Sequence, residues 1–198
     1  YSNLFNGWFA TRMMKYDENR FVMIAHSLSK DLNYSGFVPI HDSLTSLYNK
    51  HKFQEDLNNS LQQKIPFNIL ILEISNLDKI NAIYGIYHTD CLIMELSAQL
   101  KLLLHKSKLV ETYKISNNQF AIINFISYAH NSNIIDQIND VFQKNMKITS
   151  TEKIKLNHVM SINHIQNFHK NSLQILEESF QTLNTAKKKK LLSLEFNE

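Results

Sequence analysis

The residue with the clearest chemical potential is Glu73, a carboxylate that directly follows the apolar run 69–72. A run of this length with these flanks predicts a central strand, and open sheets tend to place ligands at the carboxyl ends of their strands. Hard divalent cations require anionic oxygen ligands, and two-metal chemistry on phosphates requires acids that face each other. The sequence therefore places the Glu73 carboxylate at the end of a strand, where open sheets tend to bind ligands.

The tight turn at 116–118 contains no acidic side chain. Asparagine tolerates a positive φ best after glycine, so this Ser-Asn-Asn segment keeps a hairpin turn possible without glycine. The side chains of Asn118 and of Gln119, which follows, are neutral. Asn118 cannot act as a base and is a poor ligand for Mg²⁺.

Helical and strand patterns alternate through the rest of the chain. Helix patterns occupy 76–84, 90–105, 134–142 and 171–187, and a further helix has Asp42 as its expected N-cap and ends at 64–66. Strand patterns occupy 67–74, 110–115, 120–126, 153–162 and 191–196. We expect an α/β (α+β) fold, a five-stranded mixed sheet flanked by helices on both faces.

The first forty residues read as a separate unit. Strand patterns at 8–16 and 21–28 surround a polar turn, which predicts an N-terminal β-hairpin within 1–32. Two strands alone are at best marginally stable, so this hairpin must pair with something. Residues 33–41 hold one of the three glycines and one of the two prolines, which is typical of a linker. The main domain is then expected over 42–198.

The segment 41–190 resembles a GGDEF domain, the family that makes cyclic di-GMP from two GTP molecules. Its opening, HDSLTSLYNK at 41–50 and then Phe53, resembles D-x-L-T-G-L-x-N-R…F, with Ser46 where glycine is usual. The segment 80–92 resembles I-N-D-x-Y-G-H-x-x-G-D-x-L, and Ala186-Lys187 resembles the A-K that closes the last helix. The resemblance implies the nucleotidyl-cyclase variant of the ferredoxin-like fold.

The signature of that family is replaced in this chain. Its five positions hold Ser116, Asn117, Asn118, Gln119 and Phe120. The resemblance implies that one metal-binding acid corresponds to Glu73, which is one methylene longer than the usual Asp, and the other to Asn118. Asp78 stands where the family has a lysine that approaches phosphate, and Ile86 replaces a histidine. We expect a degenerate domain with no catalytic residue, no metal, no cofactor and a vestigial Glu73.

Two candidate binding features remain. Asn81 and Asp90 match the family positions that hydrogen-bond the guanine edge, and their spacing of nine is the family's spacing. The alternative is that both residues are helix caps. The lysine run 187–190 could contact phosphate or a membrane, with Lys187 as the candidate phosphate ligand, whereas the alternative is a solvated helix end. Ser107 and Val110 stand where many cyclases carry an R-x-x-D inhibition site, so we do not expect the dinucleotide to bind there.

Composition sets further bounds. The chain has 198 residues, enough for one domain and a short extra piece, and its net charge of +3 is too mild to imply nucleic acid. A single cysteine excludes an intramolecular disulfide, and the nine histidines show no metal spacing. No apolar stretch approaches the ~20 residues of a membrane span. We expect a cytoplasmic fragment of a longer protein, without membrane contact in this part.

The expected function is a non-catalytic regulatory or dimerisation module of a bacterial cyclic di-GMP signalling protein. The hairpin before residue 33 resembles the last strands of a PAS sensor domain, although it could instead be an extension that packs on the main domain. The segment 191–198 resembles the strand that leads into an EAL domain. Alternative functions are a GTP-sensing domain that regulates a neighbouring EAL-type domain and a weakly active diguanylate cyclase. Expected partners are a second copy or neighbouring signalling domains, with weakly bound GTP.

Overall fold

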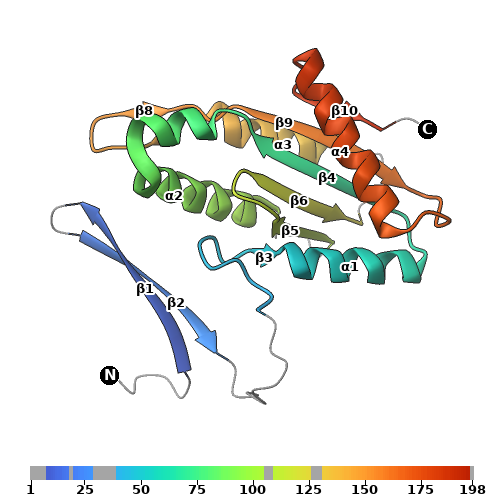
Figure 1. The fold of residues 1–198 in the computed structure, drawn as a ribbon, viewed down its shortest axis with the longest axis horizontal. Helices are drawn as coiled ribbons and strands as arrows, with labels where there is room; N and C mark the ends of the chain where they lie inside the picture. Colours follow the sequence, from blue (N-terminus) through green and yellow to red (C-terminus); the bar gives the residue numbers. More distant parts are fainter. Residues whose placement is uncertain (1–7, 18–19, 29–38, 105–108, 126–130, 197–198) are drawn as a thin grey trace. The chain divides into compact units, whose positions relative to one another are not determined.

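The computed structural model describes residues 8–17, 20–28, 39–104, 109–125 and 131–196 (Figure 1). The chain divides into two compact units, Tyr1–Pro39 and Ile40–Glu198. In the first unit, β1 (Trp8–Asp17) and β2 (Arg20–Leu28) form an antiparallel hairpin, as the sequence predicts. The identity of this hairpin as a PAS remnant stays a prediction. Most of the expected linker lies outside the described residues.

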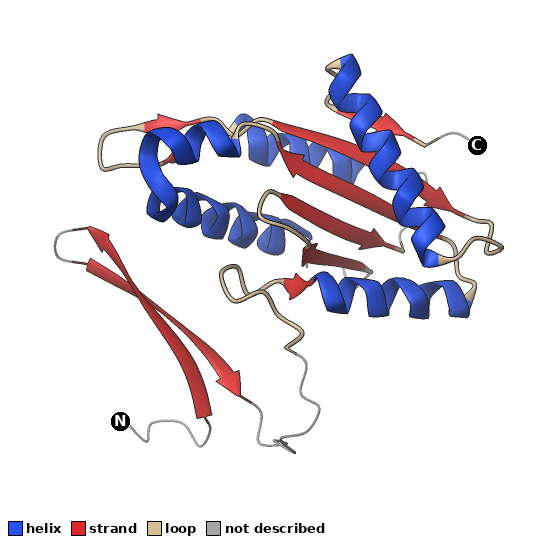
Figure 2. Ribbon diagram, in the orientation of Figure 1, coloured by secondary structure: helices blue, strands red, loops and turns tan. Residues whose placement is uncertain are grey.

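The second unit is a mixed sheet with helices on both faces (Figure 2). Its sheet has the order β10-β9-β4-β6-β5-β3, and a separate two-stranded sheet is formed by β7 and β8. The elements are β3 (Tyr48–Asn49), α1 (Lys50–Gln63), β4 (Phe67–Ile74), α2 (Leu77–Leu104), β5 (Val110–Lys114), β6 (Gln119–Asn124), α3 (Asn131–Gln143), β7 (Met146–Lys147), β8 (Lys153–Ile154), β9 (His158–Ile165), α4 (Ser172–Lys189) and β10 (Ser193–Glu195). The predicted fold class is confirmed, with the short β3 as an additional sixth strand.

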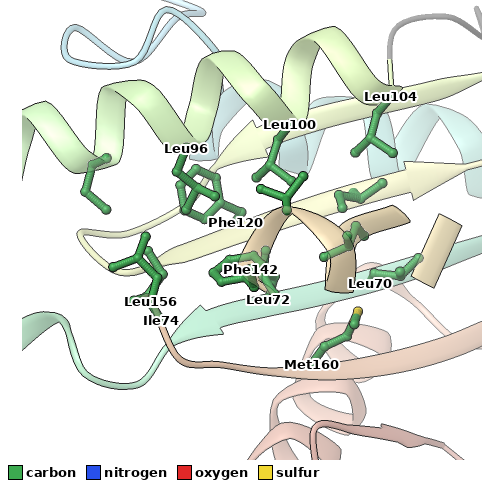
Figure 3. Packing of buried hydrophobic residues seen from close by; sticks show 14 of the residues in the cluster. Leu70, Leu72, Ile74, Leu96, Leu100, Leu104, Phe120, Phe142, Leu156 and Met160 are labelled. Carbon is green, nitrogen blue, oxygen red and sulfur yellow. The ribbon is translucent and has the colours of Figure 1, made fainter. Parts of the chain in front are cut away.

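Strand β4 lies inside the sheet and is buried on both faces. Successive side chains of a strand point to opposite faces, so an unbroken apolar run supplies two cores. Leu70 and Leu72 pack against α2 and α3, as Figure 3 shows for Leu96, Leu100 and Phe142. Ile69 and Ile71 pack on the other face, against apolar residues of α1 and α4. Residues of the same parity further along β4, including Glu73, therefore face α4.

The first helix begins later than predicted. Asn49, not Asp42, is the N-cap of α1, and its side chain accepts a hydrogen bond from the Lys52 backbone amide. Asp42 instead closes the preceding turn, because its Oδ1 accepts bonds from Thr45 N at 2.8 Å and Thr45 Oγ1 at 2.7 Å. This turn places Ser46 at a φ of 60°, a left-handed conformation that favours glycine.

The two helices predicted at 76–84 and 90–105 are continuous except for a kink at Gly85, which has φ 80° and ψ 167°. The second helical segment therefore starts after Gly85, before the predicted position at Asp90. Asn81 lies inside the first segment and Asp90 inside the second. The alternative interpretation of these two residues as helix caps is thus wrong.

The prediction of a single strand over 153–162 is also wrong. Two strands are present instead, because β8 ends at Ile154 and β9 begins at His158. Asn76, at the start of α2, bonds to the loop between them. Its Nδ2 donates to Lys155 O at 3.0 Å, and its Oδ1 accepts from Asn157 N at 2.8 Å. A long-range side-chain contact therefore replaces strand pairing there, and the alternation of apolar residues gave no sign of it.

Candidate functional site

Glu73 is a buried carboxylate whose two oxygens both have side-chain partners. Its side chain is 8 % exposed. Lys187 Nζ lies 2.7 Å from Oε1, and Gln119 Nε2 donates to Oε2 at 2.8 Å. The ammonium balances the charge and the amide provides a second donor, so the cost of burying the carboxylate is offset by protein groups.

The position of Lys187 follows from the buried face of α4. Ile175, Ser179 and Leu183 are buried at intervals of four residues, and Lys187 continues the same row one turn later. Because this row packs on the sheet face that carries Ile71, the lysine reaches the carboxylate at the end of β4. The lysine chain is 41 % exposed, so one side of this ion pair borders solvent.

Gln119 reaches Glu73 because of strand register. The two residues are directly paired across the antiparallel strands β4 and β6. Directly opposed side chains on one face lie close enough to bond. The resemblance implies a glutamate at this position, which would place a second negative charge beside Glu73, whereas the Gln119 amide donates a hydrogen bond.

Asn118 completes the edge of this cluster. Its Nδ2 donates to Ile74 O at 3.4 Å, and its backbone carbonyl accepts from Ile74 N at 2.8 Å. Its Oδ1 lies 3.3 Å from Ser116 Oγ. Glu73 is thus the only carboxylate in the cluster, and both its oxygens are occupied. These residues do not fit the paired divalent cations that the family implies, and the described residues contain no group of three or more His, Cys, Asp or Glu that could hold a metal.

The signature turn folds without the left-handed residue that the sequence analysis expected. Among the described residues, only Ser46, Lys64, Lys190 and Gly85 have a positive φ, so that expectation is wrong for 116–118. Lys114 stabilises the turn instead, because its Nζ donates to Ser116 O and, at 2.7 Å, to Asn117 O. Its side chain also lies over the ring of Phe120, 4.8 Å from the centroid.

Lys114 is buried, and burial lowers its pKa to about 8 from the ordinary value of 10.5. The negative charges of Asp42 and Asp90 act in the opposite direction and favour the ammonium. Sequence reasoning missed this residue. The available signal was a lysine inside an otherwise apolar strand pattern, immediately before a turn that has no glycine.

The candidate base-reading residues lie in a cavity of about 510 Å³, called the α2 cavity below. Asn81 and Asp90 line it together with Ser116 and Asn117 of the turn. The full lining is Asp42, Ser43, Leu44, Asn49, Lys50, Leu77, Asp78, Asn81, Ile86, Thr89, Asp90, Ile93, Lys114, Ile115, Ser116 and Asn117. The kink at Gly85 brings together residues from both segments of α2.

The predicted site residues thus fall into three places. Asn81, Asp90, Ser116 and Asn117 line the α2 cavity. Glu73, Asn118, Gln119 and Lys187 form the closed cluster beside it. Phe120 is fully buried in the core below α2 (Figure 3). Whether Lys187 binds phosphate and whether the cavity binds guanine stay predictions, and Ser107 lies outside the described residues.

A family model described as "Diguanylate cyclase, GGDEF domain" matches residues 39–191. The chain belongs to the GGDEF domain family. The match covers most of the chain and includes both the α2 cavity and the Glu73 cluster. A search of curated proteins finds no match.

Solved structures share the fold of this GGDEF domain. A diguanylate cyclase/phosphodiesterase from Caldicellulosiruptor saccharolyticus has 22 % identity and a TM-score of 0.68, covering 80 % of this chain and 95 % of that chain. The GGDEF domain of DgcB from Caulobacter crescentus, solved with c-di-GMP, has 14 % identity and a TM-score of 0.73, covering 82 % and 99 %. A LapD chain from Vibrio cholerae, comprising S helix, GGDEF and EAL and bound to c-di-GMP, has 15 % identity and a TM-score of 0.67, covering 80 % and 37 %. At these identities the likeness concerns the fold alone.

No helix within the described residues combines the length and apolar character needed to cross a membrane.

Proposed function

We propose that this GGDEF domain is a non-catalytic regulatory module of a bacterial cyclic di-GMP signalling protein. One observation carries the proposal: both carboxylate oxygens of Glu73 are bound by protein side chains, Lys187 at 2.7 Å and Gln119 at 2.8 Å. Phosphoryl transfer by metal ions needs carboxylates that are open to those ions. Glu73 is the one acid left in the cluster, and its charge already balances an ammonium.

The substitutions around Glu73 reinforce one another. A metal ion at Oε1 would have to displace Lys187, which would leave an ammonium beside a divalent cation. It would also lack a second acid, because Asn118 offers only an amide whose nitrogen bonds to Ile74 O. Asp78, at the start of α2, adds a negative charge to the cavity wall, at the position where the resemblance implies a lysine that approaches phosphate. Each change alone weakens metal-assisted transfer, and together they support a domain that regulates without turnover.

The direct test is incubation of the protein with GTP and either Mg²⁺ or Mn²⁺, followed by chromatography of the products. The expected result is no cyclic di-GMP above the level of a heated sample, while an active cyclase assayed in parallel produces it. Product that forms with the wild-type chain and disappears in a Glu73→Ala variant would contradict the proposal. It would then favour the weakly active cyclase.

A second candidate function is guanine-nucleotide sensing on behalf of a neighbouring domain. The observation that favours it is that Asn81 and Asp90, from two segments of one kinked helix, line the same cavity. An Asp carboxylate can accept two N–H groups, and an Asn amide can donate and accept. Titration with GTP, followed by calorimetry, tests this function. Binding that is lost in Asp90→Ala supports it, and an unchanged response in that variant contradicts it.

The partner of such a module would be a second copy or an adjoining domain of the same protein. The LapD chain, which contains an EAL domain after its GGDEF domain, gives one example of such an arrangement. Light scattering of the purified chain distinguishes a stable homodimer from a monomer. A cytoplasmic location of the domain is part of this proposal.

A further inference from the structure

The α2 cavity carries more negative than positive charge on its walls. Three carboxylates line it, those of Asp42, Asp78 and Asp90, against the two ammonium groups of Lys50 and Lys114. Asp78 is exposed and lies in the first turn of α2. It precedes Asn81 by three residues, so the two side chains are neighbours on one helix surface.

The cations near the cavity are largely committed to other protein groups. Lys114 Nζ binds the carbonyls of Ser116 and Asn117, and burial lowers its pKa to about 8. Lys187 does not line the cavity and pairs with Glu73. Lys50 is the exposed ammonium that remains on the cavity wall. A ligand with several phosphates would therefore meet one available cation and the carboxylate of Asp78.

The polar groups suit a neutral heterocycle. The Asp90 carboxylate accepts hydrogen bonds only, and the Asn81 amide can both donate and accept. A ring edge with adjacent N–H donors and a nearby acceptor would satisfy both side chains, and guanine has such an edge. The apolar side chains of Leu44, Leu77 and Ile93 in the lining supply a surface for the flat faces of a ring.

We propose that the α2 cavity binds guanosine in preference to GTP, and that Asp78 sets this preference by repelling phosphate groups. The inference rests on the guanine-sensing candidate above and adds the charge class of the ligand. A domain with this selectivity would respond to the nucleoside or base rather than to the triphosphate that cyclases consume.

The test compares dissociation constants for guanosine, GMP and GTP by calorimetry, in a low-salt buffer that contains a metal chelator. Adenosine serves as the base control. The wild-type chain is expected to bind guanosine roughly fivefold or more tightly than GTP, with GMP between them, because like charges within a few ångströms repel strongly when salt is low. Adenosine is expected to bind more weakly than guanosine.

Asp78→Lys is expected to reverse the order of GTP and guanosine, and Asp78→Asn to reduce the difference. The matched control is Glu177→Lys, which changes net charge equally at an exposed position of α4, on the opposite face of the sheet. Because Asp78 is exposed, both variants should keep the fold, and circular dichroism checks this.

Tighter binding of GTP than of guanosine by the wild-type chain would overturn this inference and leave guanine sensing intact. An equal change in the ratio of the GTP and guanosine dissociation constants in Asp78→Lys and Glu177→Lys would also overturn it, because net charge alone would then explain the change. If none of the guanine compounds bound, both the inference and the sensing candidate would fall, while the absence of turnover would still be judged by the product assay.

Discussion

Lys187 and Glu73 connect the last helix of the domain to its central strand, with Nζ 2.7 Å from Oε1. The carboxylate is buried and the lysine is partly exposed, so the pair lies at the border of the core. An ammonium supplied by the chain therefore balances the charge of this buried carboxylate. The proposed absence of catalysis depends on this contact.

Replacing Lys187 should destabilise the domain. In Lys187→Met the buried carboxylate keeps Gln119 as a donor but loses its counter-charge. Removal of one partner from a fully buried pair costs about 3–5 kcal/mol, and solvent on the lysine side reduces the expected loss to about 1–3 kcal/mol. Urea titration of the free energy of unfolding measures it.

Lys188→Met is the matched control, since that neighbouring lysine is exposed and should cost roughly 0.5 kcal/mol or less. Adding Glu73→Gln to Lys187→Met should recover part of the loss, because no unpaired charge remains. Equal losses in Lys187→Met and Lys188→Met would show that the ion pair does not stabilise the domain.

Ser46→Gly should stabilise the domain. Ser46 has a φ of 60°, a conformation that costs an L-residue about 1–2 kcal/mol in steric strain and does not strain glycine. The greater freedom of glycine in the unfolded chain offsets part of this gain, so the expected net gain is about 0.5–1 kcal/mol. Ser43→Gly, in the same turn but without a positive φ, should instead destabilise, and thermal unfolding of the two variants distinguishes the effects. A lower midpoint for Ser46→Gly than for wild type would refute the strain argument.

Stability should fall in mild acid because of His158. Its Nε2 lies 2.9 Å from Asn139 Oδ1, its ring lies 4.2 Å from that of Phe142 between centroids, and burial lowers its pKa to about 4 from 6.5. Below pH 6.5 the unfolded chain binds a proton at this histidine that the folded chain does not bind until about pH 4. The free energy of unfolding should therefore fall by about 2 kcal/mol from pH 7 to pH 5 through this group.

Urea titrations at the two pH values, on wild type and on His158→Gln, isolate this contribution. Glutamine does not titrate, so the variant should lose about 2 kcal/mol less than wild type between pH 7 and pH 5. His169→Gln, at an exposed position, serves as the control and should behave like wild type. Parallel curves for wild type and His158→Gln would rule out His158 as the source.

The sequence predicted the elements with strong local patterns. The strand at 67–74, the hairpin around 116–118 and the helix at 171–187 are all present, because an apolar run or a four-residue spacing reports directly on burial. Two predictions failed for different reasons. The strand expected at 153–162 is interrupted because a distant residue, Asn76, bonds to the loop inside it. Helix α1 starts later than predicted because the Asp42 side chain bonds to Thr45 in a local turn and does not cap the helix.

The candidate site shows the same limit. The neutrality of Asn118 and Gln119 was visible in the sequence, and it predicted that one acid was missing. The pairing of Lys187 with Glu73 was not predicted, because it depends on which helix covers which face of the sheet. The role of Lys114 in the turn could not be predicted from the turn residues alone, because it depends on a side chain from the preceding strand that binds the turn's carbonyls.

We propose that Lys187 and Gln119 close Glu73 to metal ions. The most direct measurement is a Mn²⁺ titration followed by electron paramagnetic resonance, on wild type and Glu73→Gln, first without nucleotide and then with GTP. The binding curves of the two proteins are expected to superimpose under both conditions, because neither protein offers an open carboxylate at this position. A saturable Mn²⁺ site that is present in wild type and absent in Glu73→Gln would contradict it.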